Sequence, residues 1–237
     1  MAHLTGEERA TYVQDMFGRI ARRYNLMNRL MTFGQDMRWR RFVVKQAQLP
    51  SGGKLLDLAT GTGDIAFEAL RSTPDAQIVG ADFSLPMMHV GQHLKNGERV
   101  GWVGADALKL PFPDNTFDAV TSGYLVRNVI DIPQTLKEQL RVLKPGGRIV
   151  ILDSSPPKDN LLKPFILMHL KYIIPLLGRI IVGAEGADAY SYLPSSTQAF
   201  KTPEDLAAIM RDTGIEHVQW KLFMFGTMAV HWGMKPQ

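Results

Sequence analysis

The segment that most constrains the fold is a short apolar run that ends in an acid and passes through two glycines into a helix. Residues 55–58 have the side chains of a buried strand, and residues 65–70 repeat apolar side chains with a helical period. Between them, Gly61 and Gly63 allow backbone conformations that other residues resist and let a ligand approach the main chain closely. Unpaired N–H groups at a helix start attract anionic groups. The segment therefore predicts a strand, turn and helix that bind a nucleotide-type cofactor.

Three acids at the ends of successive apolar runs indicate which cofactor this is. Asp57 precedes the glycines, where a carboxylate repels a pyrophosphate and attracts an ammonium group. Asp82 ends the next run, nineteen residues past Gly63, where an acid can hold ribose hydroxyls. Asp106 follows the third run. S-adenosylmethionine fits these acids, because it has a positive ammonium and sulfonium, a ribose diol and a single carboxylate.

Two other interpretations of the loop remain open. The dinucleotide pattern Gly-x-Gly-x-x-Gly accepts Ala66 at its third position in a relaxed form, which would indicate a nicotinamide-dependent oxidoreductase. The second is an ordinary α/β protein that carries acids on its loops. Calorimetry separates them, since a reduced dinucleotide would bind in place of S-adenosylmethionine in the first case.

Alternating apolar runs and helical periods predict a parallel sheet with helices on both faces. Because the last two strands are consecutive, one of them is expected to run antiparallel. The predicted fold class is α/β, with a doubly wound, seven-stranded, mainly parallel sheet, N-terminal helices and a helical lid insertion. The strands are expected near residues 53–58, 77–82, 100–104, 117–122, 147–153, 216–224 and 227–234.

The chain is expected to form one domain over residues 1–237, since its length suits one well-buried core with additions. Ser84 is predicted to cap a helix, and Thr202 another. Residues 144–147, Lys-Pro-Gly-Gly, are predicted to end the helix at 134–143 and to start the fifth strand. The expected parts are an N-terminal helical cap (1–50), a cofactor-binding half (51–155), a helical lid (156–200) and a C-terminal helix with two strands (201–237).

Composition excludes several classes of protein. The 45% apolar and 21% charged content is typical of a globular protein in water. With no cysteine, the chain has no disulfide, thiolate nucleophile or cysteine–zinc site. The six histidines are scattered, so we expect no metal site. The first nine residues are polar and lack the apolar core of a signal peptide, which predicts a cytoplasmic protein.

Positive charge is concentrated at the N-terminus. Residues 1–54 contain ten lysines and arginines against four acids, interleaved with aromatic and aliphatic side chains. This pattern is typical of helices that lie against an anionic surface, and a membrane is favoured over nucleic acid because no nucleic-acid-binding module is present. A solvated basic face is the alternative. We therefore expect peripheral contact with the inner face of the cell membrane and no nucleic-acid partner.

The least regular region runs from Pro156 to Pro194. Residues 161–182 are mostly apolar, but three cations and two prolines interrupt them and argue against a membrane-spanning helix. Broken hydrophobic helices that cover the ligand-binding edge of the sheet are expected instead, as a lid over an apolar substrate. A buried helical hairpin or a homodimer interface is the alternative.

Specific motifs connect these patterns to a known family. The most specific are residues 24–39 and the triplet Arg127-Asn128-Val129. Residues 57–64, 110–118 and 141–148, Tyr190, Tyr192-Leu193 and the ending His231-x-Gly233-x-Lys235 also match. The chain resembles the class I S-adenosylmethionine-dependent methyltransferases, which are Rossmann-like, and within them the ubiquinone/menaquinone C-methyltransferases of the UbiE/MenG type. The resemblance covers nearly all 237 residues. It departs at Asn25, Thr32, Asp36, Gly123 and Asp153, where the family usually has Asp, Ser, His, Ser and Glu.

The resemblance implies a C-methyltransferase that acts on a prenylated quinol, with demethylmenaquinol converted to menaquinol as the main expectation. Another hydrophobic small molecule or lipid is the alternative substrate, and a catalytically silent partner protein of the same fold is the alternative class. The cofactor-binding residues are predicted to be Asp57, Gly61, Thr62, Gly63, Asp82, Asp106, Ala107 and Gly123. Asp82 is assigned to the ribose, the glycine loop and Thr62 to the methionine end, and Asp106 and Ala107 to the adenine.

Methylation of a ring carbon suggests three catalytic residues. A quinol carbon becomes nucleophilic when the neighbouring phenol, whose pKa is about 10, loses its proton. A base, or a cation that lowers this pKa, is therefore needed. Asp153 is predicted to accept the proton directly or through water, Arg127 to stabilise the phenolate and Asn128 to orient it. The alternatives are a structural salt bridge for Arg127 and a cap on the following turn for Asp153.

Overall fold

Seven strands form one sheet in the order β3-β2-β1-β4-β5-β7-β6. The structure is a computed structural model that describes residues 6–157, 159–183, 189–190, 197 and 200–237. β1 to β5 are parallel, and β7 is antiparallel to both β5 and β6, as expected for the C-terminal pair. This confirms the predicted fold class. The strands are β1 (Lys54–Leu58), β2 (Gln77–Asp82), β3 (Val100–Gly104), β4 (Phe117–Gly123), β5 (Leu143–Ser154), β6 (Glu216–Phe223) and β7 (Met228–Met234).

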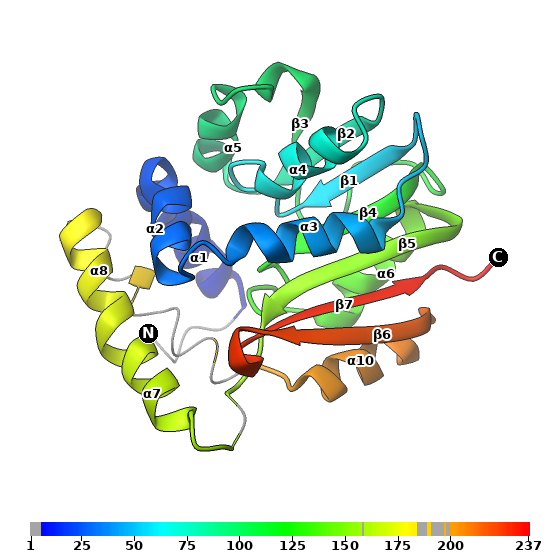
Figure 1. The fold of residues 1–237 in the computed structure, drawn as a ribbon. Helices are drawn as coiled ribbons and strands as arrows, with labels where there is room; N and C mark the ends of the chain where they lie inside the picture. Colours follow the sequence, from blue (N-terminus) through cyan, green and yellow to red (C-terminus); the bar gives the residue numbers. More distant parts are fainter. Residues whose placement is uncertain (1–5, 158, 184–188, 191–196, 198–199) are drawn as a thin grey trace.

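Helices cover both faces of the sheet because consecutive strand residues point to opposite sides. Leu55 of β1 packs in one core cluster with α3 (Asp36–Ala47) and α4 (Asp64–Ser72). Leu56 lies in the other cluster, with α6 (Ile132–Val142) and α10 (Pro203–Asp212). α5 (Leu85–Gln92) follows β2 and contacts β3. Figure 1 shows these layers, with the carboxyl ends of the parallel strands toward α1 and α2.

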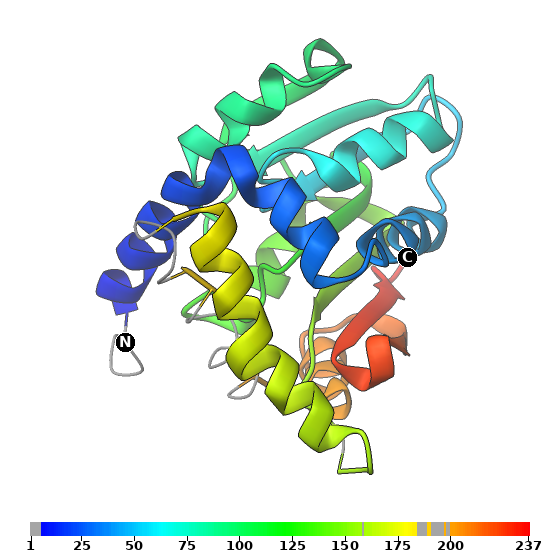
Figure 2. The same ribbon diagram turned by 60° about the vertical axis from the view of Figure 1, so that its left-hand side comes forward.

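A third core cluster lies beyond the carboxyl edge of the sheet. It joins the N-terminal helices α1 (Gly6–Ile20) and α2 (Tyr24–Met31), which the short helix η1 (Ala21–Arg23) connects, to a helix from the insertion. Figures 1 and 2 both show that helix, in yellow-green, beside the N-terminal helices in blue. Segments about 140 residues apart in the sequence therefore enclose one edge of the sheet together.

The insertion contains one continuous helix from Lys163 to Ile181, so the prediction of broken helices was wrong. It runs through α7 (Lys163–Met168), a π-helical segment η3 (His169–Ile173) and α8 (Ile174–Ile181). Pro164 lies in the first turn, where its missing N–H is not needed. Pro175 lies just after the π-helical turn, which accommodates its ring and its missing donor without ending the helix. Residues 184–188 and 191–196, with Tyr192 and Leu193, fall outside the described residues.

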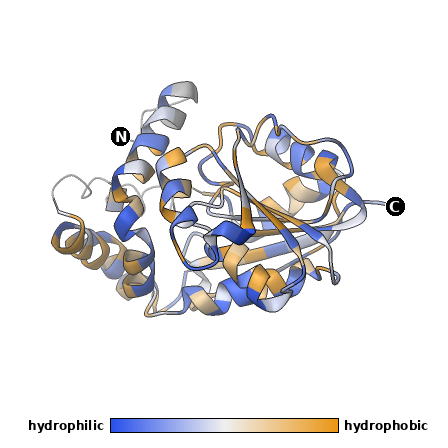
Figure 3. Cartoon of the chain, turned by 90° about the horizontal axis from the view of Figure 1, so that it is seen from above, coloured by the Kyte–Doolittle hydropathy of each residue, from blue (hydrophilic) through white to orange (hydrophobic). Residues whose placement is uncertain are grey.

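By length and composition alone, this helix could cross a membrane. The helix has 19 residues, and an 18-residue stretch of it has a mean hydropathy of 1.4. Only 17% of that stretch is buried in the protein. One side contributes Leu170 and Ile174 to the third core cluster, while the other exposes large apolar side chains. In Figure 3 this helix lies at the end of the molecule opposite the C-terminus, and much of it has the colour of hydrophobic residues. The helix is therefore apolar on both sides.

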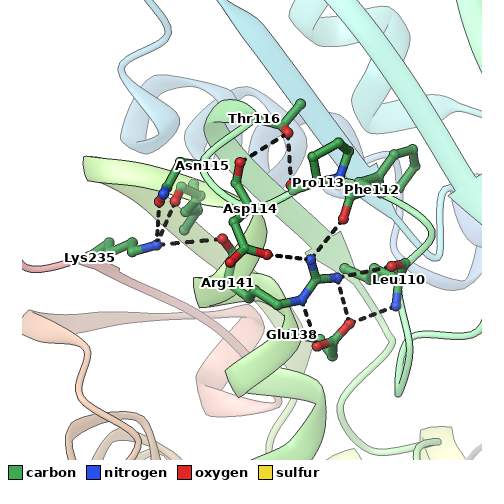
Figure 4. A network of polar contacts seen from close by, with 10 residues as sticks. Leu110, Phe112, Pro113, Asp114, Asn115, Thr116, Glu138, Arg141 and Lys235 are labelled. Atoms are coloured by element: carbon green, nitrogen blue, oxygen red, sulfur yellow. Dashed lines mark hydrogen bonds and ion pairs between the residues drawn. The ribbon is translucent and has the colours of Figure 1, made fainter.

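The fifth strand starts earlier than predicted. β5 begins at Leu143, directly after α6, and residues 144–147 form an irregularity within the strand in place of a separating turn. Gly146 has a φ of +73°, which only glycine adopts freely. The neighbouring loop is fixed by Arg141, whose guanidinium donates to the carbonyls of Leu110 and Phe112 at 2.9 and 2.8 Å. Figure 4 shows this network, which also includes Asp114, Glu138 and Lys235. The 110–118 and 141–148 motifs therefore contact each other through Arg141 and stabilise the fold.

Candidate functional site

The glycine loop turns sharply between β1 and α4, as the sequence predicted. Ala59, Gly61 and Gly63 all have positive φ, at 55°, 56° and 87°. A side chain at Gly63 would place its Cβ 2.7 Å from the Trp102 ring, so the loop packs closely on β3. Thr62 is buried, and its hydroxyl donates to Asn25 Oδ1 at 2.8 Å. Thr62 therefore connects the loop to α2.

Asp57 is buried under this loop. Its carboxylate accepts hydrogen bonds from the Thr60 hydroxyl at 2.7 Å and from the Thr121 hydroxyl at 2.9 Å. Burial raises the pKa of Asp57 to about 7, and these two hydrogen bonds oppose the rise. Asp57 therefore shapes the floor of the loop, and the sequence could not show that both its oxygens are already paired.

Asp82 connects the loops that follow β1 and β2. Its carboxylate accepts from the backbone N–H of Gly61 at 2.7 Å and of Ser84 at 2.8 Å. Burial raises the pKa of Asp82 to about 6, against the effect of these backbone donors. Ser84 is at the predicted N-cap of α5, but Asp82 takes its N–H and the Ser84 hydroxyl makes no capping bond.

A narrow cavity of about 50 Å³ lies at this point, lined by Gly61, Asp82, Ser84 and Gly123 among others. It is at the carboxyl ends of β1 and β4, from which the strand order continues in opposite directions. Such a switch point is where open α/β sheets bind ligands. Thus three predicted cofactor residues, Gly61, Asp82 and Gly123, line one cavity, with Thr62 and Gly63 in the same loop and Asp57 on β1 beneath it.

Asp106 and Ala107 lie outside this cavity. Asp106 is exposed after β3, and its carboxylate accepts from the Leu108 N–H at 2.9 Å. Ala107 is partly buried against the core cluster that contains α6. Their assignment to the adenine therefore stays a prediction.

A second, larger cavity of about 340 Å³ lies between the N-terminal helices, the helix at 163–181 and the carboxyl ends of β4 and β5. Most of its lining is aliphatic or aromatic, with Met16, Ile20, Met31, Phe165, Leu170, Ile174 and Met228 among the residues. Phe17, Tyr24, Tyr124 and Asn128 line both cavities, so the two adjoin. The narrow cavity beside Asp82 and the large apolar cavity therefore meet at these four side chains.

Arg127 and Asp153 form a buried ion pair beside the large cavity. Their side chains are 4% and 1% exposed, and Arg127 Nη1 lies 2.5 Å from Asp153 Oδ1. The carboxylate also accepts from the backbone N–H groups of Arg127 and Ser154. Burial opposes the charge on Arg127, but the pair with Asp153 keeps the pKa of Arg127 above its usual value. Arg127 lines the cavity and Asp153 does not, so the structure brings together two predicted catalytic residues but exposes only the cation to a ligand.

Tyrosines surround the junction of the two cavities. The Arg127 guanidinium lies 4.7 Å from the centroid of the Tyr124 ring, and Asn128 donates to the Tyr124 carbonyl at 2.8 Å. Burial raises the pKa of both Tyr24 and Tyr124, which keeps their phenols protonated. Sequence reasoning missed these tyrosines and Ser154 as site residues. The available signal was Tyr24, which starts the most specific family motif.

Solved structures of methyltransferases share this fold. The Haloferax volcanii complex between the Trm112 methyltransferase activator and a putative methyltransferase aligns with a TM-score of 0.65 and 19% identity, over 93% of this chain and 98% of that chain. Phosphoethanolamine N-methyltransferase 2 from Haemonchus contortus, in complex with S-adenosyl-L-methionine, aligns with a TM-score of 0.63 and 17% identity, over 84% of this chain and 53% of that chain. At these identities the likeness shows the fold alone, and that fold is the Rossmann-like methyltransferase fold.

The family is shown by sequence. The chain belongs to the ubiE/COQ5 methyltransferase family, whose model matches residues 4–235. The ubiquinone/menaquinone biosynthesis C-methyltransferase UbiE of Desulfotalea psychrophila is 52% identical, over 94% of this chain and 90% of its own length. The demethylmenaquinone methyltransferase of Roseiflexus castenholzii is 42% identical, over 97% and 95%. These relatives confirm the family that the motifs indicated.

Proposed function

We propose that this protein transfers a methyl group from S-adenosyl-L-methionine to a ring carbon of a prenylated quinol, converting demethylmenaquinol to menaquinol. The observation that carries the proposal is the junction of a narrow cavity at the switch point, whose lining includes Asp82 and Ser84, with a large apolar one. Family membership supports the methyl transfer, and the names of the relatives support the quinol.

The narrow cavity suits an adenosine cofactor. The Asp82 carboxylate accepts hydrogen bonds from the backbone N–H groups of Gly61 and Ser84, and its two oxygens have lone pairs left for a ribose hydroxyl. The buried Ser84 hydroxyl lines the cavity and has no partner among the residues described here. When bound, S-adenosylmethionine supplies a methyl group on a positively charged sulfur, which is a good leaving group. Gly61, Thr62 and Gly63 would hold its methionine end, and Asp106 and Ala107 its adenine.

Arg127 is the residue that best activates the acceptor. A cation next to a quinol hydroxyl stabilises the phenolate and so raises the nucleophilicity of the ring carbon. Asp153 holds the guanidinium in place through the ion pair and does not line the cavity. We therefore assign Asp153 to positioning Arg127, with the proton leaving through water. Asn128, at the junction, would orient the ring.

A transfer assay with demethylmenaquinol and a demethoxyubiquinol-type acceptor side by side tests this proposal. Mass spectrometry of the products should show one added methyl group on the naphthoquinol ring. Calorimetry should show binding of S-adenosylmethionine and none of a reduced dinucleotide. Binding without any transfer would indicate a catalytically silent partner protein, and transfer only to another apolar molecule would indicate a different acceptor.

The protein also needs access to a substrate whose tail resides in a bilayer. Phe33, Leu162, Phe165 and Phe225 are exposed and also line the large cavity, so its mouth opens onto an apolar surface. The exposed side of the neighbouring helix continues this surface with Met168, Tyr172, Leu176 and Ile180.

Charge favours an anionic bilayer as the partner of this apolar surface. No acid occurs between residues 160 and 183, whereas Lys163, Lys171 and Arg179 do. Basic residues next to apolar ones draw such a helix into the membrane interface. We therefore propose peripheral association with the inner face of the cell membrane, with a homodimer across the same surface as the other outcome of a sedimentation test.

A further inference from the structure

Several buried polar atoms around the large cavity have no hydrogen-bond partner among the described residues. Among the lining residues, four candidates that supply such atoms are Asn28 Nδ2, Trp39 Nε1, Ser154 Oγ and Tyr190 Oη. Buried polar groups are almost always paired in folded proteins, because an unpaired one keeps the cost of its lost hydration. A group of unpaired polar atoms around one apolar cavity therefore points to a ligand with polar atoms of its own.

Two of the four have simpler explanations. The Asn28 carboxamide is a hydrogen-bonding neighbour of the Tyr24 hydroxyl. Trp39 is one of the largest fully buried side chains and packs in the core beneath the sheet. Ser154 and Tyr190, with 5% and 3% of their surface exposed, are the hydroxyl groups that a ligand would have to satisfy.

These two hydroxyls come from different walls of the cavity. Ser154 ends β5 and follows Asp153, whose carboxylate accepts its N–H at 2.7 Å, so Ser154 stands on the side held by the Arg127–Asp153 pair. Tyr190 packs against the helix at 163–181, where a Cβ on Gly178 would lie 2.5 Å from its ring. Burial, together with the neighbouring Tyr24, raises the pKa of Tyr190 and keeps it a hydrogen-bond donor.

We propose that Ser154 and Tyr190 recognise the two ring oxygens of a dihydroxylated aromatic acceptor. This inference rests on the proposed function, and it assigns the residues that fix how the ring lies. One oxygen would pair with Ser154 beside Arg127, and the other with Tyr190 under the helix, while the aliphatic lining contacts the ring. Holding both oxygens selects which ring carbon faces the narrow cavity, and such orientation contributes strongly to rate.

The test uses Ser154→Ala and Tyr190→Phe in the full chain. The probe is a naphthalene-1,4-diol with a short prenyl chain, kept reduced, together with two analogues that each lack one hydroxyl. Calorimetry without the cofactor should show that each variant binds the diol about two- to ten-fold more weakly than wild type, the range of one net hydrogen bond. For each variant, one of the two analogues lacks the ring hydroxyl that would pair with the substituted side chain. The variant should bind that analogue as well as wild type does.

Two matched controls remove the same atoms elsewhere. Ser122→Ala deletes another buried hydroxyl that has no partner among the described residues and does not line the large cavity. Tyr172→Phe deletes an exposed hydroxyl on the outer side of the helix. Both should bind the diol as wild type does. Without any ligand, the Ser154→Ala and Tyr190→Phe variants should melt at or above the melting temperature of wild type, because each loses a buried hydroxyl that has no partner among the described residues.

The proposal is overturned if the diol does not bind, if the variants bind it like wild type, or if they lose all three probes equally or melt lower. Failure of the proposed function looks different. If wild type and the variants show the predicted pattern of binding but wild type transfers no methyl group, the proposed function is refuted and the assignment of Ser154 and Tyr190 to the ring oxygens stands. Normal transfer with variants that match wild type would refute the recognition alone.

Discussion

Replacing Arg127 by methionine separates a structural role from a chemical one. The substitution removes the cation and leaves the Asp153 charge at 1% exposure, where it still accepts hydrogen bonds from the backbone N–H groups of residues 127 and 154. Breaking a buried pair in this way costs about 3–5 kcal/mol. For a chain of this size each kcal/mol corresponds to about 2–4 °C, so the melting temperature should fall by roughly 6–20 °C.

A second substitution should restore stability without restoring activity. In the double variant Arg127→Met with Asp153→Asn, the buried charge is gone and the side-chain amide oxygen at position 153 still accepts a backbone hydrogen bond. Most of the lost stability should return. Turnover should stay about 10²–10³-fold below wild type, which is the effect of removing one group that stabilises a developing oxyanion. Affinity for S-adenosylmethionine should stay near wild type in both variants.

Calorimetric melting, cofactor titration and single-turnover methyl transfer measure these three quantities. Arg71→Met is the matched control, because Arg71 is exposed and its pair with Glu68 on α4 should contribute little to stability. If the double variant regains turnover together with stability, Arg127 has only a structural role. If the single variant melts like wild type, the Asp153 carboxylate is not left as an uncompensated buried charge, and the Arg127–Asp153 pair does not stabilise the fold.

Three further outcomes are expected. Asp82→Ala should weaken S-adenosylmethionine binding about ten-fold or more, the value of a charge-assisted hydrogen bond, and unchanged affinity in a titration would refute its assignment to the ribose. The raised pKa of Asp57, about 7 against 3.8, means that the folded protein keeps a proton that the unfolded chain releases. Urea denaturation should therefore show stability falling from about pH 4 to 7, by up to about 4 kcal/mol more than in Asp57→Asn, and equal slopes would contradict the shift. Changing the exposed residues Arg22, Arg23 and Arg41 to Glu should reduce sedimentation with anionic vesicles at low salt, while turnover of a short-tailed acceptor stays unchanged. If binding does not depend on the charge of the vesicles, the basic N-terminal surface is only solvated and does not contact a membrane.

Local patterns predicted the sheet well because strand and helix periods depend on neighbouring residues. The turn after β1 needed its glycines at positive φ, and both are found there. Thr202 caps α10 as expected, accepting the Asp205 N–H at 3.1 Å. The prolines of the insertion predicted broken helices wrongly, because a helix with a π-helical turn can include a proline that a regular helix would not tolerate.

Burial of charge was harder to predict than secondary structure. Arg40 looked like part of the basic N-terminal surface, but its guanidinium is buried and pairs with Asp36 and Asp64 at 3.1 and 2.8 Å. Sequence position does not reveal such a partner, since Asp64 is on α4 and 24 residues away. The exposed basic surface is correspondingly smaller than the sequence count suggested.

The sequence by itself determined the strand–turn–helix of the cofactor loop, the strand pattern and the family, because each depends on residues close together in the chain. Only the tertiary structure decided that Arg127 and Asp153 pair, and that α2, β5 and the helix at 163–181 enclose one apolar cavity. The physical reason is that ion pairs and cavities arise between segments up to about 140 residues apart, where the energy of a contact depends on burial and distance in space.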